Sequence, residues 1–238
     1  MNHVVIFAGG IGSRMGNTGC PKQFLKLDDK EIIVHTIERF QRHSSIDGIY
    51  IACHVDWMDC MKELVEKYAL TKVKSIVPGG QTGQLSIYNG LLEAEKYKET
   101  DDDIVLIHDG VRPNIDEALI SENIKCVREK GSSISCSPAI ETVLLVDEER
   151  NIKQIEDRSM CFYAKAPQSF LLKDIISCHR HALDEGRTNF IDSCTMMKYY
   201  GFELHLVPCS SDNIKITTPK DFYLLKALQH IENNDLVD

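Results

Sequence analysis

The residues of this sequence that are best suited to chemistry follow its first apolar run, residues 4–8. The cluster consists of Gly9, Gly10, Gly12, Arg14 and Lys22. Glycines let backbone N–H groups come close to an anion because they lack a Cβ atom, and the two cations add positive charge. We therefore predict a triphosphate-binding turn at the carboxyl end of a buried strand.

Two better-known glycine loops fit this stretch less well. A Walker loop requires Lys and then Ser or Thr after its second glycine, but Gly12 is followed by Ser13 and Arg14. A dinucleotide-binding loop requires its third glycine at position 15, whereas the sequence places it at Gly16. That loop also requires an acidic residue about 20 positions later, where this sequence has a helical pattern. An NAD-linked oxidoreductase is therefore the least favoured interpretation.

A second glycine loop follows the apolar run at residues 73–77. It holds Gly80, Gln81, Gly83 and Ser86, and it runs directly into a helical pattern. A loop of this kind allows close approach of a ligand to the backbone. An ordinary Gly-Gly turn before a helix is the alternative interpretation of the same residues.

An acidic residue ends the apolar run at residues 103–108. Asp109 would stand where an α/β fold binds its ligands, and a carboxylate there can hold Mg²⁺, which prefers carboxylate and phosphate oxygens. A helix N-cap is the alternative role, but the next helical pattern starts only near Asp116. Arg112 belongs either to the active site or to a structural ion pair, and the sequence leaves both possibilities open.

Apolar runs and helical patterns alternate along the chain. Strands are predicted at 4–8, 48–53, 73–77, 103–108, 132–137 and 202–207. Helices are predicted at 31–41, 57–68, 172–185 and 191–200. This order predicts an α/β fold with a Rossmann-like, mostly parallel sheet, helices on both faces, and ligands at the carboxyl ends of the strands.

The pattern changes between residues 139 and 166. Short alternating runs at 142–146 and 152–155 flank a charged turn at 147–151, which is typical of a β-hairpin. A hairpin that projects from an α/β core leaves its edges unpaired unless a partner covers them. We expect residues 139–166 to form a β-arm of a single domain that spans residues 1–238.

Composition excludes several classes of protein. A formal net charge of −9 argues against a nonspecific nucleic-acid binder, which needs a basic surface. The sequence has no apolar run of 18 residues, and no basic and apolar leader precedes the first strand, so we expect a cytoplasmic protein without membrane spans. The nine cysteines include no C-x-x-C pair, which favours scattered reduced thiols over a metal site or a disulfide framework.

Three segments of the sequence resemble the signature of the cytidylyltransferases that make CDP-linked polyols. They are Ala8-Gly9-Gly10-x-Gly12-x-Arg14-Met15-Gly16, Pro21-Lys22-Gln23-Phe24-Leu25 and the stretch from Asp212-Asn213-Ile214-Lys215 to Pro219. This family comprises ribitol-5-phosphate cytidylyltransferase and 2-C-methyl-D-erythritol 4-phosphate cytidylyltransferase. The resemblance implies CTP and a polyol phosphate as substrates, with Mg²⁺ at Asp109. It also implies a homodimer that is clasped by the β-arm.

The resemblance implies a role for each matched residue. The catalytic residues it implies are Arg14, Lys22, Arg158 and Lys215, with Arg158 lent to the active site of the other subunit. The nucleotide-binding residues are Phe7, Ala8, Gly9, Gly10, Gly12, Gly80, Gln81, Gly83, Ser86 and Gly110. The residues expected to bind the polyol phosphate are Arg112, Thr142, Arg158, Asp192 and Lys215. Without the resemblance, Arg158 after Glu156-Asp157 would be interpreted as a salt-bridged surface residue.

Two positions depart from the family pattern. Gly83 stands where the family usually has Arg, and Ala166 stands where it usually has Thr before Pro-Gln. D-ribitol 5-phosphate is the preferred acceptor, and 2-C-methyl-D-erythritol 4-phosphate is the alternative. The two departures also motivate a hypothesis from another class, a nucleotide-binding homologue without catalytic activity.

Overall fold

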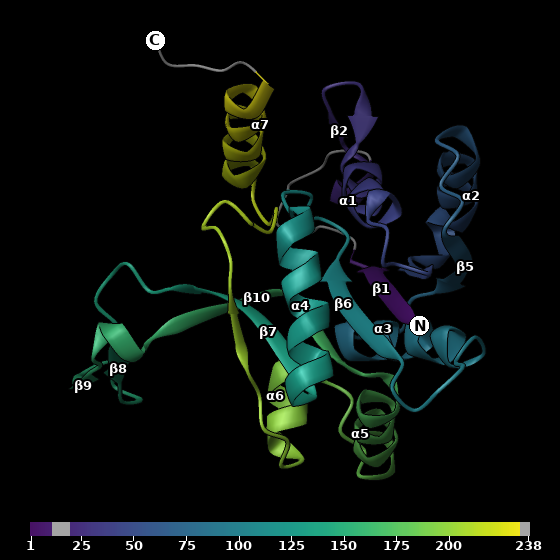
Figure 1. The fold of residues 1–238 in the computed structure, drawn as a ribbon. Coiled ribbons are helices and arrows are strands. Elements are labelled where there is room, and N and C mark those ends of the chain that lie inside the picture. Colours follow the sequence, from purple (N-terminus) through teal and green to yellow (C-terminus); the bar gives the residue numbers. More distant parts are fainter. Residues whose placement is uncertain (11–19, 234–238) are drawn as a thin grey trace.

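The computed structural model describes residues 1–10 and 20–233, and its centre is a seven-stranded sheet (Figure 1). The strands are β1 (Asn2–Ala8), β4 (Gly48–Cys53), β5 (Val73–Pro78), β6 (Ile104–Asp109), β7 (Ser132–Pro138), β10 (Phe162–Leu171) and β11 (Leu206–Pro208). Their order across the sheet is β11-β7-β10-β6-β1-β4-β5. Only β10 runs antiparallel to its neighbours, so the expected mostly parallel sheet is confirmed.

Helices cover both faces of this sheet. They are α1 (Ile32–Arg42), α2 (Met58–Lys67), α3 (Gly83–Glu95), α4 (Glu117–Lys130), α5 (Leu172–Asp184), α6 (Ser193–Tyr199) and α7 (Pro219–Asn233). Apolar side chains of α1, α2 and α4 pack on one face, and those of α3, α5 and α6 pack on the other. Successive residues of β1 join opposite clusters, Val4 and Ile6 in one and Val5 in the other, as the alternation along a buried strand requires.

Smaller elements complete the fold. Two short strands pair as β2 (Lys26–Leu27) and β3 (Lys30–Glu31), and single turns of 3-10 helix form η2 (Lys22–Phe24), η3 (Val55–Trp57) and η4 (Arg158–Met160). Helix α4 begins with Asp116 as its N-cap, so the expectation that Asp109 does not cap this helix is confirmed. A third apolar cluster joins Leu225 of α7 to Leu27, Ile32, Val111 and Ile216.

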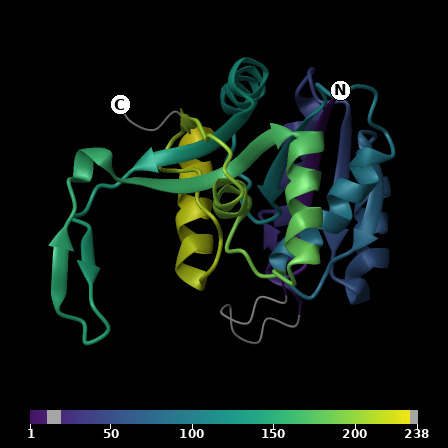
Figure 2. The same ribbon diagram turned by 90° about the horizontal axis from the view of Figure 1, so that it is seen from below.

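The predicted hairpin is present and stands away from the body of the molecule (Figure 2). It consists of β8 (Leu144–Val146) and β9 (Ile152–Ile155), which pair antiparallel. Its apolar side chains are exposed, namely Leu144, Leu145, Val146, Ile152 and Ile155. Apolar side chains in such a position are typical of a surface that another chain covers.

The sequence did not predict strand β10, which begins inside the segment expected to form the arm. Residues 162–164 are exposed, whereas residues 166–170 are buried between β6 and β7. Because burial changes along the strand, and because Pro167 and a register shift between Ala164 and Gln168 interrupt it, the sequence shows no continuous strand pattern here. The predicted last strand at 202–207 is also wrong in extent, because only residues 206–208 pair with β7.

Candidate functional site

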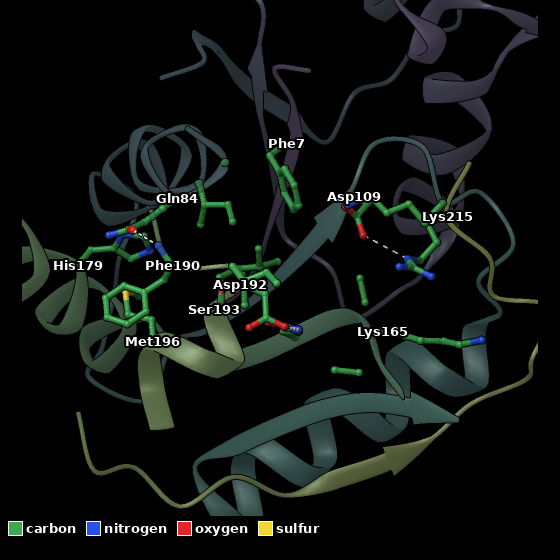
Figure 3. A pocket seen from close by; sticks show the side chains of 18 residues that line it. Phe7, Gln84, Asp109, Lys165, His179, Phe190, Asp192, Ser193, Met196 and Lys215 are labelled. Carbon is green, nitrogen blue, oxygen red and sulfur yellow. Dashed lines mark hydrogen bonds and ion pairs between the residues drawn. The ribbon is translucent and has the colours of Figure 1, made fainter. Parts of the chain in front are cut away.

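A cavity of about 300 Å³ lies where β1 and β6 end, with further walls from β10, α3, α5 and α6 (Figure 3). This is the edge of the sheet where the sequence predicted a ligand site. The predicted site residues in its wall are Phe7, Gly83, Asp109, Arg112, Asp192 and Lys215. The first apolar run, the second glycine loop, the acidic strand end and the segment 212–219 therefore each contribute a residue to one cavity.

Asp109 is the last residue of β6 and carries the negative charge at one end of the cavity. Its Oδ1 lies 2.5 Å from the Lys215 ammonium, and its Oδ2 lies 3.2 Å from Nε of Arg112. Burial acts to raise the pKa of Asp109, but the charges of Lys215 and Arg112 outweigh it and lower the pKa to about 2. The carboxylate is therefore ionised at neutral pH.

Arg112 forms the ion pair that was one of its two expected roles, and it also lies in the cavity wall. It forms the ion pair with Asp109, and its Nη1 also donates to the Asn213 carbonyl at 2.7 Å. Although the residue is only 8 % exposed, it lines the cavity. These partners hold the guanidinium at the wall, where it can face an anionic ligand.

The segment around Lys215 brings the distant motifs together. The Lys22 ammonium donates to the Ile216 carbonyl at 2.8 Å, and the Ile216 N–H donates to the Val111 carbonyl at 3.0 Å. Lys215 lies next to these bonds and places its ammonium 5.7 Å from the ring centroid of Phe7. Lys22 thus contacts the segment that carries Lys215, and Lys215 in turn contacts Asp109 in the cavity wall.

The backbone at the end of β1 is bound by the side chain of Gln23, which lies in the segment 21–25. Nε2 of Gln23 donates to the Ala8 carbonyl at 2.7 Å and to the Gly10 carbonyl at 3.0 Å. Gln23 is buried, so these bonds fix where the glycine turn begins. Gly12 and Arg14, which were predicted to bind the triphosphate, lie outside the described residues.

The two predicted glycine loops lie against each other. A Cβ atom at Gly9 would come within 3.0 Å of the Ser86 hydroxyl, which explains why a larger residue would disturb this contact. The Ser86 hydroxyl accepts from the Gly80 N–H at 3.0 Å and donates to the Thr82 carbonyl at 2.9 Å. Ser86 therefore shapes the second loop, while Gln81 in the same loop is exposed.

Gly83 begins α3 at the cavity, and Thr82 caps this helix by accepting the Leu85 N–H at 3.2 Å. The neighbouring Gln84 binds the loop before α6 instead of extending freely into the cavity. Its Nε2 donates to the Arg187 carbonyl at 2.9 Å, and its Oε1 accepts the Phe190 N–H at 2.8 Å. A Cβ atom built at Gly83 meets nothing within 4 Å apart from its chain neighbours and its own helix backbone, so a side chain could begin at this position without a clash.

Gly110 follows Asp109 and packs tightly against the first strand and the first helix. Its N–H donates to the Phe7 carbonyl at 3.1 Å, and a Cβ atom there would come within 2.5 Å of Cδ1 of Ile33. The absence of a side chain therefore allows the end of β6 to approach the end of β1.

Asp192 faces the cavity from the side of β10 and α6 (Figure 3). Its Oδ1 caps α6 by accepting the Thr195 N–H at 2.8 Å, and its Oδ2 accepts from Nε2 of Gln168 at 3.0 Å. Gln168 is fixed in turn because its Oε1 accepts the Cys194 N–H at 2.8 Å. A carboxylate held in this way can accept hydrogen bonds from hydroxyl groups of a ligand.

The far end of the cavity is mainly apolar, and the sequence did not predict it. His179 lies there with Phe190 and Met196, and neither of its ring nitrogens has a hydrogen-bond partner. It stacks on Tyr88 at 5.2 Å between ring centroids, and burial lowers its pKa to about 4. No local motif marks these residues, since they come from α5, α6 and the loop between them.

The two residues predicted in the β-arm lie away from this cavity. Thr142 and Arg158 are exposed, and neither contributes to its wall. Nη1 of Arg158 donates to the Ile140 carbonyl at 3.1 Å, within the arm itself. Ala166 does lie in the wall, where its methyl group provides no hydroxyl contact.

Comparison with known proteins shows the family. The family model described as IspD, 2-C-methyl-D-erythritol 4-phosphate cytidylyltransferase, matches residues 2–230. A ribitol-5-phosphate cytidylyltransferase from Streptococcus agalactiae serotype III is 52% identical over 237 residues, which cover 100% of this chain and 99% of the relative. A ribitol-5-phosphate cytidylyltransferase from Vibrio parahaemolyticus serotype O3:K6 is 47% identical over 234 residues, with 98% of each chain covered.

Solved structures agree with this assignment. The crystal structure of 4-diphosphocytidyl-2C-methyl-D-erythritol synthase from Anaerococcus prevotii superposes with a TM-score of 0.82 at 25% sequence identity. The alignment covers 97% of this chain and 96% of that chain. Within the described part of the chain, no helix has both the length and the apolar character needed to cross a membrane.

Proposed function

Because this chain belongs to the 2-C-methyl-D-erythritol 4-phosphate cytidylyltransferase family of nucleotidyltransferases, we propose that it transfers the cytidylyl group of CTP to D-ribitol 5-phosphate. The products are CDP-ribitol and pyrophosphate. The observation that carries this choice of acceptor is the end-to-end identity of 52% and 47% to relatives named ribitol-5-phosphate cytidylyltransferase. The alternative acceptor, 2-C-methyl-D-erythritol 4-phosphate, is not favoured by these relatives.

The reaction needs alignment and charge neutralisation more than proton transfer. An oxygen of the acceptor phosphate attacks the α-phosphorus of CTP, a new P–O bond forms, and the bond to the β-phosphate breaks as pyrophosphate leaves. Lys22 and Arg14 stabilise the triphosphate and the charge that builds up on the leaving pyrophosphate. Lys215 and Arg112, which lie at the cavity wall beside Asp109, orient the attacking phosphate.

The donor set at Asp109 fits Mg²⁺ bound together with the nucleotide. The described residues contain no group of three or more His, Cys, Asp or Glu side chains that could hold a metal by themselves. Mg²⁺ is commonly held by one or two carboxylates and by substrate phosphates, and Asp109 is ionised at the cavity. Asp109 and the CTP phosphates would hold the ion, which supplies positive charge to the phosphate oxygens.

A homodimer would complete the site. The exposed apolar side chains of β8 and β9 suit a surface that a second copy covers, and Arg158 lies outside the cavity of its own chain. In such a dimer the arm brings Arg158 and Thr142 to the acceptor phosphate in the active site of the other subunit. The hypothesis of a homologue without catalytic activity loses support, because the chain keeps all three residues: Lys215 contacts Asp109, and Lys22 contacts the carbonyl of the neighbouring Ile216.

The test is release of pyrophosphate from CTP by the full chain with Mg²⁺, measured in parallel with D-ribitol 5-phosphate and 2-C-methyl-D-erythritol 4-phosphate. We expect turnover with the first acceptor and a kcat/KM at least tenfold lower with the second. Preference for the second acceptor would refute the proposed acceptor. Tight CTP binding without pyrophosphate release from either acceptor would refute the proposed activity.

A further inference from the structure

Lys165 lies in the cavity wall, although no sequence motif pointed to it. It belongs to β10 and directly precedes Ala166. Its ammonium donates to the carbonyls of Ser210 at 3.2 Å and Ser211 at 2.9 Å. The loop that contains these two carbonyls leads to Lys215, so Lys165 borders the part of the site that holds Asp109.

Positive charge exceeds negative charge at this end of the cavity. Arg112, Lys165 and Lys215 provide three cations, and Asp109 provides one carboxylate, which both Arg112 and Lys215 contact. Among the described residues, no carboxylate forms a salt bridge with Lys165. Burial lowers the pKa of Lys165, and the charge of Arg112 acts in the same direction, whereas Cys209 and Asp212 nearby act to raise it. An anionic ligand would relieve this imbalance.

Lys165 shares strand β10 with Gln168, which holds a second polar group of the cavity. Lys165 and Phe7 lie at separate parts of the cavity wall (Figure 3), since Lys165 belongs to β10 and Phe7 to β1. Asp192 is held by Gln168 with its carboxylate toward the cavity. The pocket thus offers a cation for a phosphate and a carboxylate for hydroxyl groups, as a polyol phosphate requires.

We propose that Lys165 binds the phosphate of the acceptor in the same subunit that carries Asp109, and that it thereby selects a phosphorylated polyol. This inference rests on the proposed function for the class of the acceptor. The two carbonyls orient the ammonium and leave one of its three N–H groups for the ligand. The partner's arm is not needed for this contact.

The test replaces Lys165 in the full-length protein and measures KM for each substrate separately. Lys165→Met keeps the length of the side chain and removes its charge, and Lys165→Arg keeps the charge. We expect Lys165→Met to raise KM for D-ribitol 5-phosphate roughly ten- to hundredfold, since the loss of one hydrogen bond to a charged group weakens binding by about this factor. KM for CTP should stay within about twofold, and Lys165→Arg should recover most of the loss.

A matched control distinguishes binding of the acceptor phosphate by Lys165 from the hydrogen bonds by which Lys165 fixes the loop at Ser210 and Ser211. Nδ2 of Asn114 donates to the Asp212 carbonyl at 3.1 Å, so Asn114→Ala removes an uncharged tie to the same loop. This variant should leave both KM values unchanged. The proposal is overturned if Lys165→Met raises KM for CTP as much as for the acceptor, if Asn114→Ala has the same effect, or if neither KM changes.

Failure of the proposed function would give a different result. In that case the unmodified protein does not use D-ribitol 5-phosphate, and the role of Lys165 is tested by calorimetric titration with inorganic phosphate. Weaker phosphate binding by Lys165→Met than by the unmodified protein and by Asn114→Ala supports the phosphate site. Equal phosphate binding by all three proteins refutes it.

Discussion

Replacing Asp109 by asparagine would test the electrostatic design of the site most directly. The substitution keeps the shape of the side chain but removes the negative charge that lies between Arg112 and Lys215. Because Asp109 is 6 % exposed, solvent compensates little for this loss. Two cations would then face each other without a carboxylate between them.

The expected loss of stability follows from the pKa. The pKa of Asp109 falls from 3.8 to about 2 on folding, which corresponds to about 2 kcal/mol at neutral pH. A lowered carboxyl pKa contributes stability above pH 3.8 and loses this contribution as the pH falls through about 2. Asp109→Asn should therefore lower the free energy of unfolding by about 2 kcal/mol at pH 7 and by much less near pH 2.

The assay is urea unfolding of both proteins at pH 7 and at low pH, together with pyrophosphate release at pH 7. Asp101→Asn is a matched control, because Asp101 also contacts a lysine, Lys98, but is exposed on the surface. We expect the control to leave stability and turnover unchanged. Asp109→Asn should lower kcat by about a hundredfold or more, since it also removes the proposed ligand of Mg²⁺.

Equal stability of Asp109→Asn and the unmodified protein at pH 7 would refute the electrostatic reasoning. A loss of stability that is just as large near pH 2 would also refute it, because the carboxyl is then largely protonated in the unfolded state and about half protonated in the folded state, so little of its contribution remains. Normal kcat in a stable variant would refute the role of Asp109 in catalysis. These outcomes are independent, so the structural role and the catalytic role can fail separately.

Two further predictions concern the arm and the apolar end of the cavity. If Arg158 acts in the other subunit, an equal mixture of the inactive variants Arg158→Ala and Lys22→Ala should recover about a quarter of the normal activity through mixed dimers. A mixture no more active than its components, or a monomer in gel filtration, would contradict this. Since burial lowers the pKa of His179 to about 4, the protein should lose about 3 kcal/mol of stability between pH 7 and pH 4 from this residue. His179→Leu should show a shallower pH dependence in urea unfolding, and an unchanged slope would count against it.

Local patterns made much of the fold predictable. The strands that end at Ala8, Cys53 and Asp109 are continuous apolar runs, and such runs are typical of parallel strands that are buried on both faces. Strand β10 escaped prediction because its burial changes halfway along its length and Pro167 interrupts the pattern. Asp109, predicted at the end of a strand, and Lys215, predicted in the segment 212–219, form an ion pair at the cavity.

The sequence by itself determined the alternation of strands and helices, the glycine turns and the acidic strand end, because each depends on residues close together in the chain. Only the tertiary structure decided that Lys165 and Lys215 border the same end of one cavity, and that His179 is buried at the other. These neighbours come from distant segments that packing on both faces of the sheet brings together. Hydrophobic periodicity specifies which face of an element is buried, but not which side chains meet beyond it.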